Sequence, residues 1–165
     1  MSIGSMPTQE QDNEVALSPR PVILVVEDEA LIAIMLGEIL ADAGYDAVLA
    51  HSGEEALLLA KSMERLSAVV TDIHLMRGID GRSVMRELRK VNSTLPVVVV
   101  TGFGQWAPEA DLRGLGGPTA RLVKPFSGDQ LIASLAGVLA STNGRAPRSN
   151  DRERAASLNW TANNS

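Results

Sequence analysis

Short runs of aliphatic residues alternate with amphipathic stretches along most of the chain. The clearest run is Val97–Val100, four consecutive valines, which is typical of a central parallel strand buried on both faces. Val22–Val26 has the same aliphatic character and nearly the same length. Together with the weaker runs, the pattern predicts strands at 22–26, 46–50, 68–71, 97–100 and 120–123.

Apolar side chains at helical spacing fill most of the stretches between these runs. Residues 30–43 carry apolar side chains three and four positions apart, and Gly44 follows as a typical helix-ending residue. Capping boxes that open two further helices consist of Ser52 with Glu55 and Ser127 with Gln130. The predicted helices run over 30–43, from Ser52 to about Met63, over 82–91, and from Ser127 to about Ala140.

The segment 102–118 interrupts this regular pattern because it is rich in glycine and proline. The residues concerned are Gly102, Gly104, Gly114, Gly116, Gly117, Pro108 and Pro118. Since a glycine costs up to about 1 kcal/mol relative to alanine within a helix, any helix here is expected to be short and marginal. A simple connector and a switching element are both compatible with this composition.

Five strands that alternate with helices define an α/β fold of the (βα)5 type. Such a fold is a doubly wound, five-stranded parallel sheet with helices on both faces and right-handed crossovers. In open sheets of this kind, ligands bind beyond the carboxyl ends of the strands. The residues that directly follow the apolar runs are therefore the candidates for function.

Length and composition limit the class of protein. A chain of 165 residues accommodates one domain with tails, and we predict a disordered leader at 1–20, a domain at 21–141 and a disordered polar tail at 142–165. Apolar residues make up 45% of the chain and aromatic residues only 3%, so the core is expected to be aliphatic.

Charge, cysteine content and hydropathy exclude several functions. A net charge of −5 argues against general nucleic-acid binding. The lack of cysteine excludes disulfide scaffolds and thiolate-ligated metals. The sequence shows neither a signal-peptide pattern nor an apolar run near the roughly 20 residues of a membrane span. We therefore expect a cytoplasmic protein without nucleic-acid or membrane partners.

Acidic, hydroxyl and amine side chains follow the predicted strands. Glu27 and Asp28 close the first run, Asp72 closes the third, and Thr101 and Lys124 follow the last two. Two ionised carboxylates about 5 Å apart repel by roughly 3 kcal/mol at an effective dielectric near 20, so a cation is expected among them. Oxygen ligands of this kind favour Mg²⁺. A carboxylate in such a site can also act as a nucleophile toward a phosphoryl group.

Residues 22–140 resemble the receiver domain of two-component response regulators, a CheY-like family. The motifs that carry the resemblance are Val-Val-Glu-Asp-Glu at 25–29, Thr-Asp-Ile-His-Leu at 71–75, Asp-Gly at 80–81, Val-Val-Thr-Gly at 99–102 and Lys-Pro-Phe at 124–126. Each motif is weak alone, but all five in this order form a specific signal. The resemblance implies a flavodoxin-like sheet with the strand order 2-1-3-4-5.

The resemblance also implies a role for each candidate residue. Asp72 is the implied phosphoacceptor, and Thr101 and Lys124 are implied to bind the phosphoryl oxygens. The implied Mg²⁺ ligands are Asp28, Asp72, Glu27 and the backbone carbonyl of His74. A cis peptide bond is implied between Lys124 and Pro125.

Four features depart from the common receiver pattern. Glu27 stands where aspartate is more frequent, and the loop 76–79 is one residue longer than usual and lacks a proline. Arg121 occupies the place of the usual aromatic switch residue. The stretch Thr101–Gly104 resembles the motif of the "FAT GUY" subset of single-domain receivers, and Phe103 is a candidate to replace the aromatic switch.

The function implied by the resemblance is that of a stand-alone response regulator. Asp72 would receive a phosphoryl group, with Mg²⁺, from a sensor histidine kinase or a histidine phosphotransfer protein. The chain would catalyse only its own phosphorylation and dephosphorylation, so it is not expected to be an enzyme. Output would pass to an unknown downstream protein or onward in a phosphorelay, with 102–118 as a switch helix and Trp106 as a partner contact.

Other interpretations of the same residues stay open. The unusual loop and Arg121 fit a receiver-like module that binds partners without phosphorylation. A small Mg²⁺ phosphohydrolase would normally carry a second acid two residues after the nucleophile, where this chain has His74. Glu27 and Asp28 could serve only as charges at a helix N-terminus. Asp80-Gly81 is expected to form a turn and a helix entry.

Overall fold

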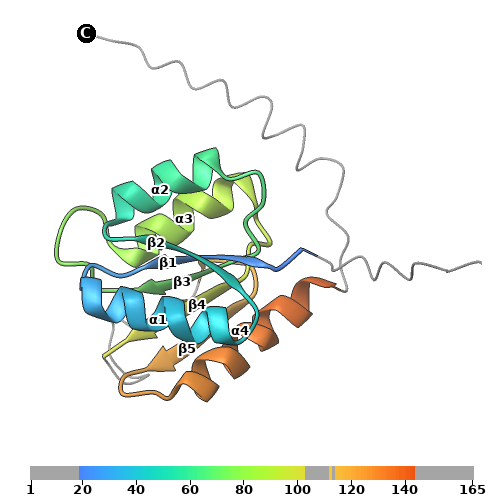
Figure 1. Cartoon of the computed structure of the whole chain (residues 1–165). Coiled ribbons are helices and arrows are strands. Elements are labelled where there is room, and N and C mark those ends of the chain that lie inside the picture. The colour runs from blue at the N-terminus through green and yellow to red at the C-terminus, as the bar shows by residue number, and fades with distance from the viewer. Residues whose placement is uncertain (1–18, 103–111, 113, 144–165) are drawn as a thin grey trace, which may run out of the picture.

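The computed structural model describes residues 19–102, 112 and 114–143, which form an open parallel sheet covered by helices on both faces (Figure 1). Its strands are β1 (Val22–Val26), β2 (Asp46–Ala50), β3 (Ala68–Asp72), β4 (Val97–Thr101) and β5 (Thr119–Val123). All neighbouring strands are parallel, and their order is β2-β1-β3-β4-β5. The predicted fold class and strand order are therefore confirmed.

The two central strands are buried along their whole length, as their continuous aliphatic composition predicts. Every residue of β3 and β4 is buried, whereas the edge strand β2 has mostly half-buried residues. Because successive side chains of a strand point to opposite faces, these strands supply two separate cores. One core contains Ile23, Val25, Val70 and Val98, and the other contains Leu24, Val69, Val97 and Val99.

Two helices complete each core. The described helices are α1 (Ala30–Asp42), α2 (Gly53–Ser62), α3 (Gly81–Val91) and α4 (Gly128–Asn143). In Figure 1, α1 and α4 cover one face of the sheet, and α2 and α3 cover the other. Leu36 of α1 and Leu135 of α4 pack into the first core, and Ala56 of α2 and Met85 of α3 pack into the second.

The two helix starts that were predicted from capping boxes are confirmed by hydrogen bonds. Ser52 Oγ accepts a hydrogen bond from the Glu55 backbone N–H at 3.1 Å. Ser127 Oγ accepts one from the Gln130 N–H at 3.2 Å, and Gln130 Oε1 accepts one from the Ser127 N–H at 2.8 Å. Both boxes satisfy backbone donors that a helix leaves without an internal partner.

Several predicted boundaries differ from the structure by one to three residues. β3 and β4 include Asp72 and Thr101, because these residues continue the hydrogen-bonded ladder with the adjacent strand. α3 begins at Gly81 rather than Arg82, and α4 continues to Asn143 rather than ending near Ala140.

The predicted leader and polar tail lie almost wholly outside the described residues, as does most of the segment 102–118 with its expected switch helix. Among the described residues, no helix is both long enough and apolar enough to cross a membrane.

Candidate functional site

The candidate residues come from four strands and gather at one edge of the sheet. Glu27 and Asp28 follow β1, Asp72 ends β3, Thr101 ends β4, and Lys124 follows β5. The strand register brings them to the same level, since Val26 pairs with Thr71, Asp72 with Val100, and Thr101 with Val123. Parallel strands present their carboxyl ends at a common edge, and this is the edge at which doubly wound folds bind ligands.

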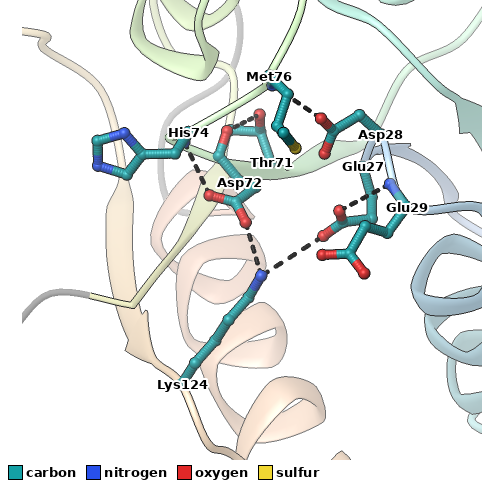
Figure 2. Close-up of polar contacts among 8 residues, drawn as sticks. All are labelled: Glu27, Asp28, Glu29, Thr71, Asp72, His74, Met76 and Lys124. Atoms are coloured by element: carbon teal, nitrogen blue, oxygen red, sulfur yellow. Dashed lines mark hydrogen bonds and ion pairs between the residues drawn. The ribbon is translucent and has the colours of Figure 1, made fainter.

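Asp72 is the best-connected carboxylate of this edge (Figure 2). Its side chain is buried, with the residue only 8% exposed, and Oδ2 accepts a hydrogen bond from Lys124 Nζ at 2.6 Å. Oδ1 accepts a second bond from the His74 backbone N–H at 2.8 Å. The Thr71 hydroxyl donates to the Asp72 carbonyl at 2.9 Å. The carboxylate is thus held in one orientation by a cation on one side and a backbone donor on the other.

Lys124 provides the positive charge at the centre of the site. Its Nζ lies 3.7 Å from Glu27 Oε2 in addition to its bond with Asp72. Burial lowers the pKa of Lys124, but the hydrogen bond and charge of Asp72 and the charge of Glu27 outweigh this effect, so the pKa is raised. The Lys124 backbone N–H donates to the Thr101 carbonyl at 2.8 Å, and the Lys124–Pro125 peptide bond is cis, as the sequence predicted.

Glu27 is the most deeply buried acid of the site, with only 2% of its surface exposed. Its Oε1 accepts a hydrogen bond from the Glu29 backbone N–H at 3.1 Å. Burial raises the pKa of Glu27 above its ordinary value, and the charges of Asp72 and Asp28 raise it further. The Glu29 donor and Lys124 lower the pKa by less than these effects together raise it. Glu27 therefore lies close to the Lys124 ammonium as well as just before the N-terminus of α1.

Asp28 and Thr101 occupy the same edge but have different surroundings. Asp28 Oδ2 accepts a hydrogen bond from the Met76 backbone N–H at 2.7 Å, in the loop between β3 and α3. Figure 2 shows this contact on the side of Asp28 that faces the loop. Thr101 is completely buried at the end of β4. Both residues stand where the sequence predicted them.

The donor set of this edge has the chemistry of a magnesium site. Three carboxylates and a backbone carbonyl at position 74 are hard oxygen ligands of the kind Mg²⁺ prefers. Within the described part of the chain, however, no three acidic or histidine side chains converge as a ready metal-binding group. Each carboxylate is instead turned toward a donor of its own, as Figure 2 shows. The oxygen ligands suit Mg²⁺ chemically. To bind the ion, the carboxylates would have to give up some of these hydrogen bonds in exchange for contacts with the metal.

Of the predicted switch or contact residues, the structure describes only Arg121. Phe103 and Trp106 lie outside the described residues. Arg121 lies in the middle of β5 and pairs with Val99 of β4. Its Nε is buried, and no hydrogen-bond acceptor for that atom was found among the described residues.

Two contacts that shape the site were not predicted from the sequence. A Cβ at Gly81 would collide with the Asp72 carbonyl and lie 2.7 Å from Thr71 Oγ1, so only glycine lets α3 approach β3 this closely. Asp80 Oδ1 caps the same helix by accepting from the Ser83 N–H at 2.7 Å, which confirms the predicted turn and helix entry. Glu54 was also missed, because its partner in the loop, Ile79, is 25 positions away.

A parallel α/β fold with a buried aspartate and a lysine at its carboxyl edge defines the general class of this protein. Residues 23–136 match the family model of the response regulator receiver domain, and the chain belongs to that family. Receiver domains are signalling modules of two-component systems. The resemblance stated from the five motifs is thereby confirmed.

Curated proteins with similar sequences are regulators. The chain is 41% identical over 118 residues to the probable transcriptional regulator ycf27 of Pyropia yezoensis, covering 71% of this chain and 46% of that protein. It is 36% identical over 121 residues to the response regulator MprA of Mycobacterium avium (strain 104), covering 73% of this chain and 51% of that protein. The chain thus spans about half the length of these curated relatives.

Solved structures agree with this assignment. A response regulator receiver protein from Sinorhizobium medicae WSM419 superposes with a TM-score of 0.65 at 30% identity, covering 74% of this chain and 96% of the other. A CheY-like receiver domain protein from Methanospirillum hungatei JF-1 superposes with a TM-score of 0.69 at 21% identity, covering 77% and 99%. The second match supports the fold alone.

Proposed function

We propose that the chain is a phospho-accepting response regulator in which Asp72 receives the phosphoryl group. The observation that carries the proposal is the contact between the buried Asp72 carboxylate and Lys124 Nζ at 2.6 Å. A carboxylate buried beside a single lysine, with two further acids next to it, is unusual for a group that serves structure only. Membership of the receiver family supports the same role.

The proposed donor is the phosphohistidine of a sensor histidine kinase or of a histidine phosphotransfer protein. An Asp72 oxygen attacks the phosphorus atom, an O–P bond forms, and the N–P bond to the histidine breaks. The leaving imidazole keeps the electron pair of that bond and takes up a proton. Later attack by water on the acyl phosphate returns inorganic phosphate and the free carboxylate. Under this proposal the chain turns over no other substrate.

The residues around Asp72 can position and stabilise the transferred group. Lys124 already contacts Oδ2 of Asp72, so its ammonium lies where negative charge on the phosphoryl oxygens would develop. Thr101 ends the strand beside Asp72 and is proposed to donate a hydrogen bond to a phosphoryl oxygen. Bound Mg²⁺, held by Asp28, Asp72, Glu27 and the His74 carbonyl, would neutralise the remaining charge.

The finer classification and the output are also proposals. The stretch Thr101–Gly104 supports kinship with the "FAT GUY" subset of receivers. We propose that phosphorylation is read by a downstream protein through contact with the receiver domain, or passed on in a phosphorelay. The added charge of about −1.5 to −2 at Asp72 is the primary signal in both cases.

Beryllofluoride, a phosphoryl mimic that binds aspartate together with Mg²⁺, tests the proposal without a known kinase. We expect it to raise the melting temperature of the chain by several degrees when Mg²⁺ is present, because a ligand that binds only the folded state stabilises it. Asp72→Asn should abolish this rise, and omission of Mg²⁺ should do the same. A rise that persists in Asp72→Asn would place the acceptor elsewhere. No rise in the parent chain would favour a module that binds partners without phosphorylation.

A further inference from the structure

We infer that the backbone N–H of Met76 competes with a divalent cation for Asp28, so that metal binding releases the loop between β3 and α3. The inference rests on the proposed function, because it takes Asp28 as a metal ligand. It adds a feature that follows from the contacts of this chain: metal binding is coupled to the position of the loop tip at Met76.

Three backbone donors of this loop are held by three carboxylates. The His74 N–H donates to Asp72 Oδ1 at 2.8 Å, the Met76 N–H to Asp28 Oδ2 at 2.7 Å, and the Ile79 N–H to Glu54 Oε1 at 3.1 Å. The acceptors are Asp72 of β3, Asp28 after β1, and Glu54 in the first turn of α2. Two of these three acceptors are proposed metal ligands, whereas Glu54 is not.

The bond from Met76 to Asp28 is short and charge-assisted. Hydrogen bonds to an ionised acceptor are stronger than neutral ones, and 2.7 Å is at the short end of their range. Met76 is 87% exposed, so its side chain packs little against the domain, and the backbone hydrogen bond to Asp28 holds this part of the loop in place. Figure 2 shows the Asp28 side chain reaching to the loop at this point.

The present arrangement keeps the carboxylates apart. Among the described residues, no three acidic or histidine side chains form a metal-binding group, although Glu27, Asp28 and Asp72 share one edge of the sheet. We expect the Asp28 carboxylate to turn from the loop toward β3 when Asp28 and Asp72 bind one ion. That movement breaks its bond with the Met76 N–H. The free energy of this bond therefore opposes metal binding.

The far end of the loop is pinned independently of the metal. Gly78 has a positive φ of 74°, and a Cβ there would collide with the Glu54 carboxylate, so the loop lies directly against α2. The Ile79 N–H bond to Glu54 holds this end in place. Release at Met76 would thus move the exposed tip of the loop while its end at Ile79 stays fixed.

Titration of the full chain with Mg²⁺ by calorimetry tests the inference. Met76→Pro removes the N–H without changing any acidic residue, and we expect it to lower the Mg²⁺ dissociation constant about three- to ten-fold, from the usual strength of a hydrogen bond. Met76→Ala is the matched control, since it removes the exposed side chain but keeps the N–H. Its dissociation constant should stay within about two-fold of the parent value.

A second measurement on the parent chain covers the case in which the proline variant does not fold. In amide NMR spectra, the Met76 proton should resonate downfield because of its short bond and move upfield when Mg²⁺ saturates the site. The Ile79 proton, bonded to Glu54, should stay in place. An unchanged or weaker affinity in Met76→Pro, an equal gain in Met76→Ala, or a Met76 proton that stays downfield would overturn the inference alone. If the parent shows no binding of Mg²⁺ that depends on Asp28 and Asp72, the proposed function fails with it.

Discussion

Glu27, Asp72 and Lys124 lie close together at the carboxyl edge of the sheet. Lys124 attracts both carboxylates, and the two carboxylates repel each other. Lys124 Nζ lies 2.6 Å from Asp72 Oδ2 but 3.7 Å from Glu27 Oε2. Its ion pair with Glu27 is therefore the weaker of the two. Burial is the largest cause of the raised pKa of Glu27, and the charges of Asp72 and Asp28 add to it. The raised pKa means that ionised Glu27 costs some stability in the folded state.

This cost gives a prediction for Glu27→Gln. Because the folded pKa of Glu27 is raised above its unfolded value of 4.5, folding favours the protonated form. The cost is absent well below pH 4.5 and is fully present once the pH has risen past the folded pKa. Without Mg²⁺, we expect the variant to be more stable than the parent by about 1–2 kcal/mol at neutral pH, because an ionised carboxylate is no longer buried in the folded state. The gain should shrink as the pH falls toward 4.5.

Denaturant unfolding at several pH values measures this effect. Glu38→Gln on the exposed side of α1 serves as the control and should change stability by no more than about 0.5 kcal/mol at any of these pH values. A Glu27→Gln variant that is less stable than the parent at pH 7, or a gain that grows on acidification, would contradict the account of Glu27.

At the scale of the elements, glycine and arginine contacts set the positions of α3 and β5 around the site. Gly81 lets the first turn of α3 touch the end of β3, and Arg89 at the other end of α3 reaches the segment that leads into β5. Gly81, next to Asp72, and Arg89, at the far end of α3, therefore position α3 against β3 and against the segment that leads into β5.

Gly81→Ala should be strongly disruptive for this reason. The added Cβ would meet the Asp72 carbonyl and the Thr71 hydroxyl, so α3 must move away from the strand that carries Asp72, the proposed phosphoacceptor. We expect a loss of at least about 2 kcal/mol in the free energy of unfolding. Gly137→Ala in α4 is the matched control: its Cβ meets nothing within 4 Å, and we expect a gain of about 0.5–1 kcal/mol. Equal effects of the two substitutions in chemical denaturation would contradict the close contact at Gly81.

Arg89 gives a second prediction at this scale. Its guanidinium is buried, with the residue 7% exposed, and burial lowers its pKa to about 10. The group nevertheless keeps its charge at neutral pH, and its acceptors are the Leu95, Leu115, Gly116 and Pro118 carbonyls and the Thr119 hydroxyl. These bonds join the end of α3 to the beginnings of β4 and β5.

Arg89→Met should remove the whole set of bonds and leave the carbonyl of the buried Leu95 without its Arg89 donors. We expect a loss of about 2–4 kcal/mol in the free energy of unfolding. Lys90→Met is the control, because Lys90 is exposed and forms only a surface ion pair with Glu87, worth about 0.5 kcal/mol or less. In thermal or urea unfolding, a loss of stability in Arg89→Met no greater than that in Lys90→Met would refute the stabilising role of the Arg89 hydrogen bonds.

For the molecule as a whole, the sequence predicted what depends on local pattern. Aliphatic runs such as Val97–Val100 indicated the strands, and the capping boxes at Ser52 and Ser127 indicated two helix starts; all of these are present. The placement of polar residues after the strands predicted which side chains share an edge. The strand order came from the family resemblance and is also confirmed.

Contacts between distant segments were beyond this kind of reasoning. The bonds from Arg89 to the Leu115 carbonyl and from the Met76 N–H to Asp28 join residues 26 and 48 positions apart. Each depends on how helices and loops pack on the finished sheet, and no spacing in the sequence signals it. The helix entry at Asp80-Gly81 was predicted, whereas the close contact of Gly81 with the end of β3 was not.

Intact-mass spectrometry after incubation with acetyl phosphate and Mg²⁺ tests the role of Asp72 most directly. We expect the parent chain to gain one phosphoryl group, and expect no gain without Mg²⁺ or in Asp72→Asn. Asp46→Asn, which changes an exposed aspartate at the start of β2, is the control and should gain the group as the parent does. A phosphoryl group that appears on Asp72→Asn, or a parent chain that stays unmodified and also fails to bind beryllofluoride, would contradict the assignment of Asp72 as the phosphoacceptor.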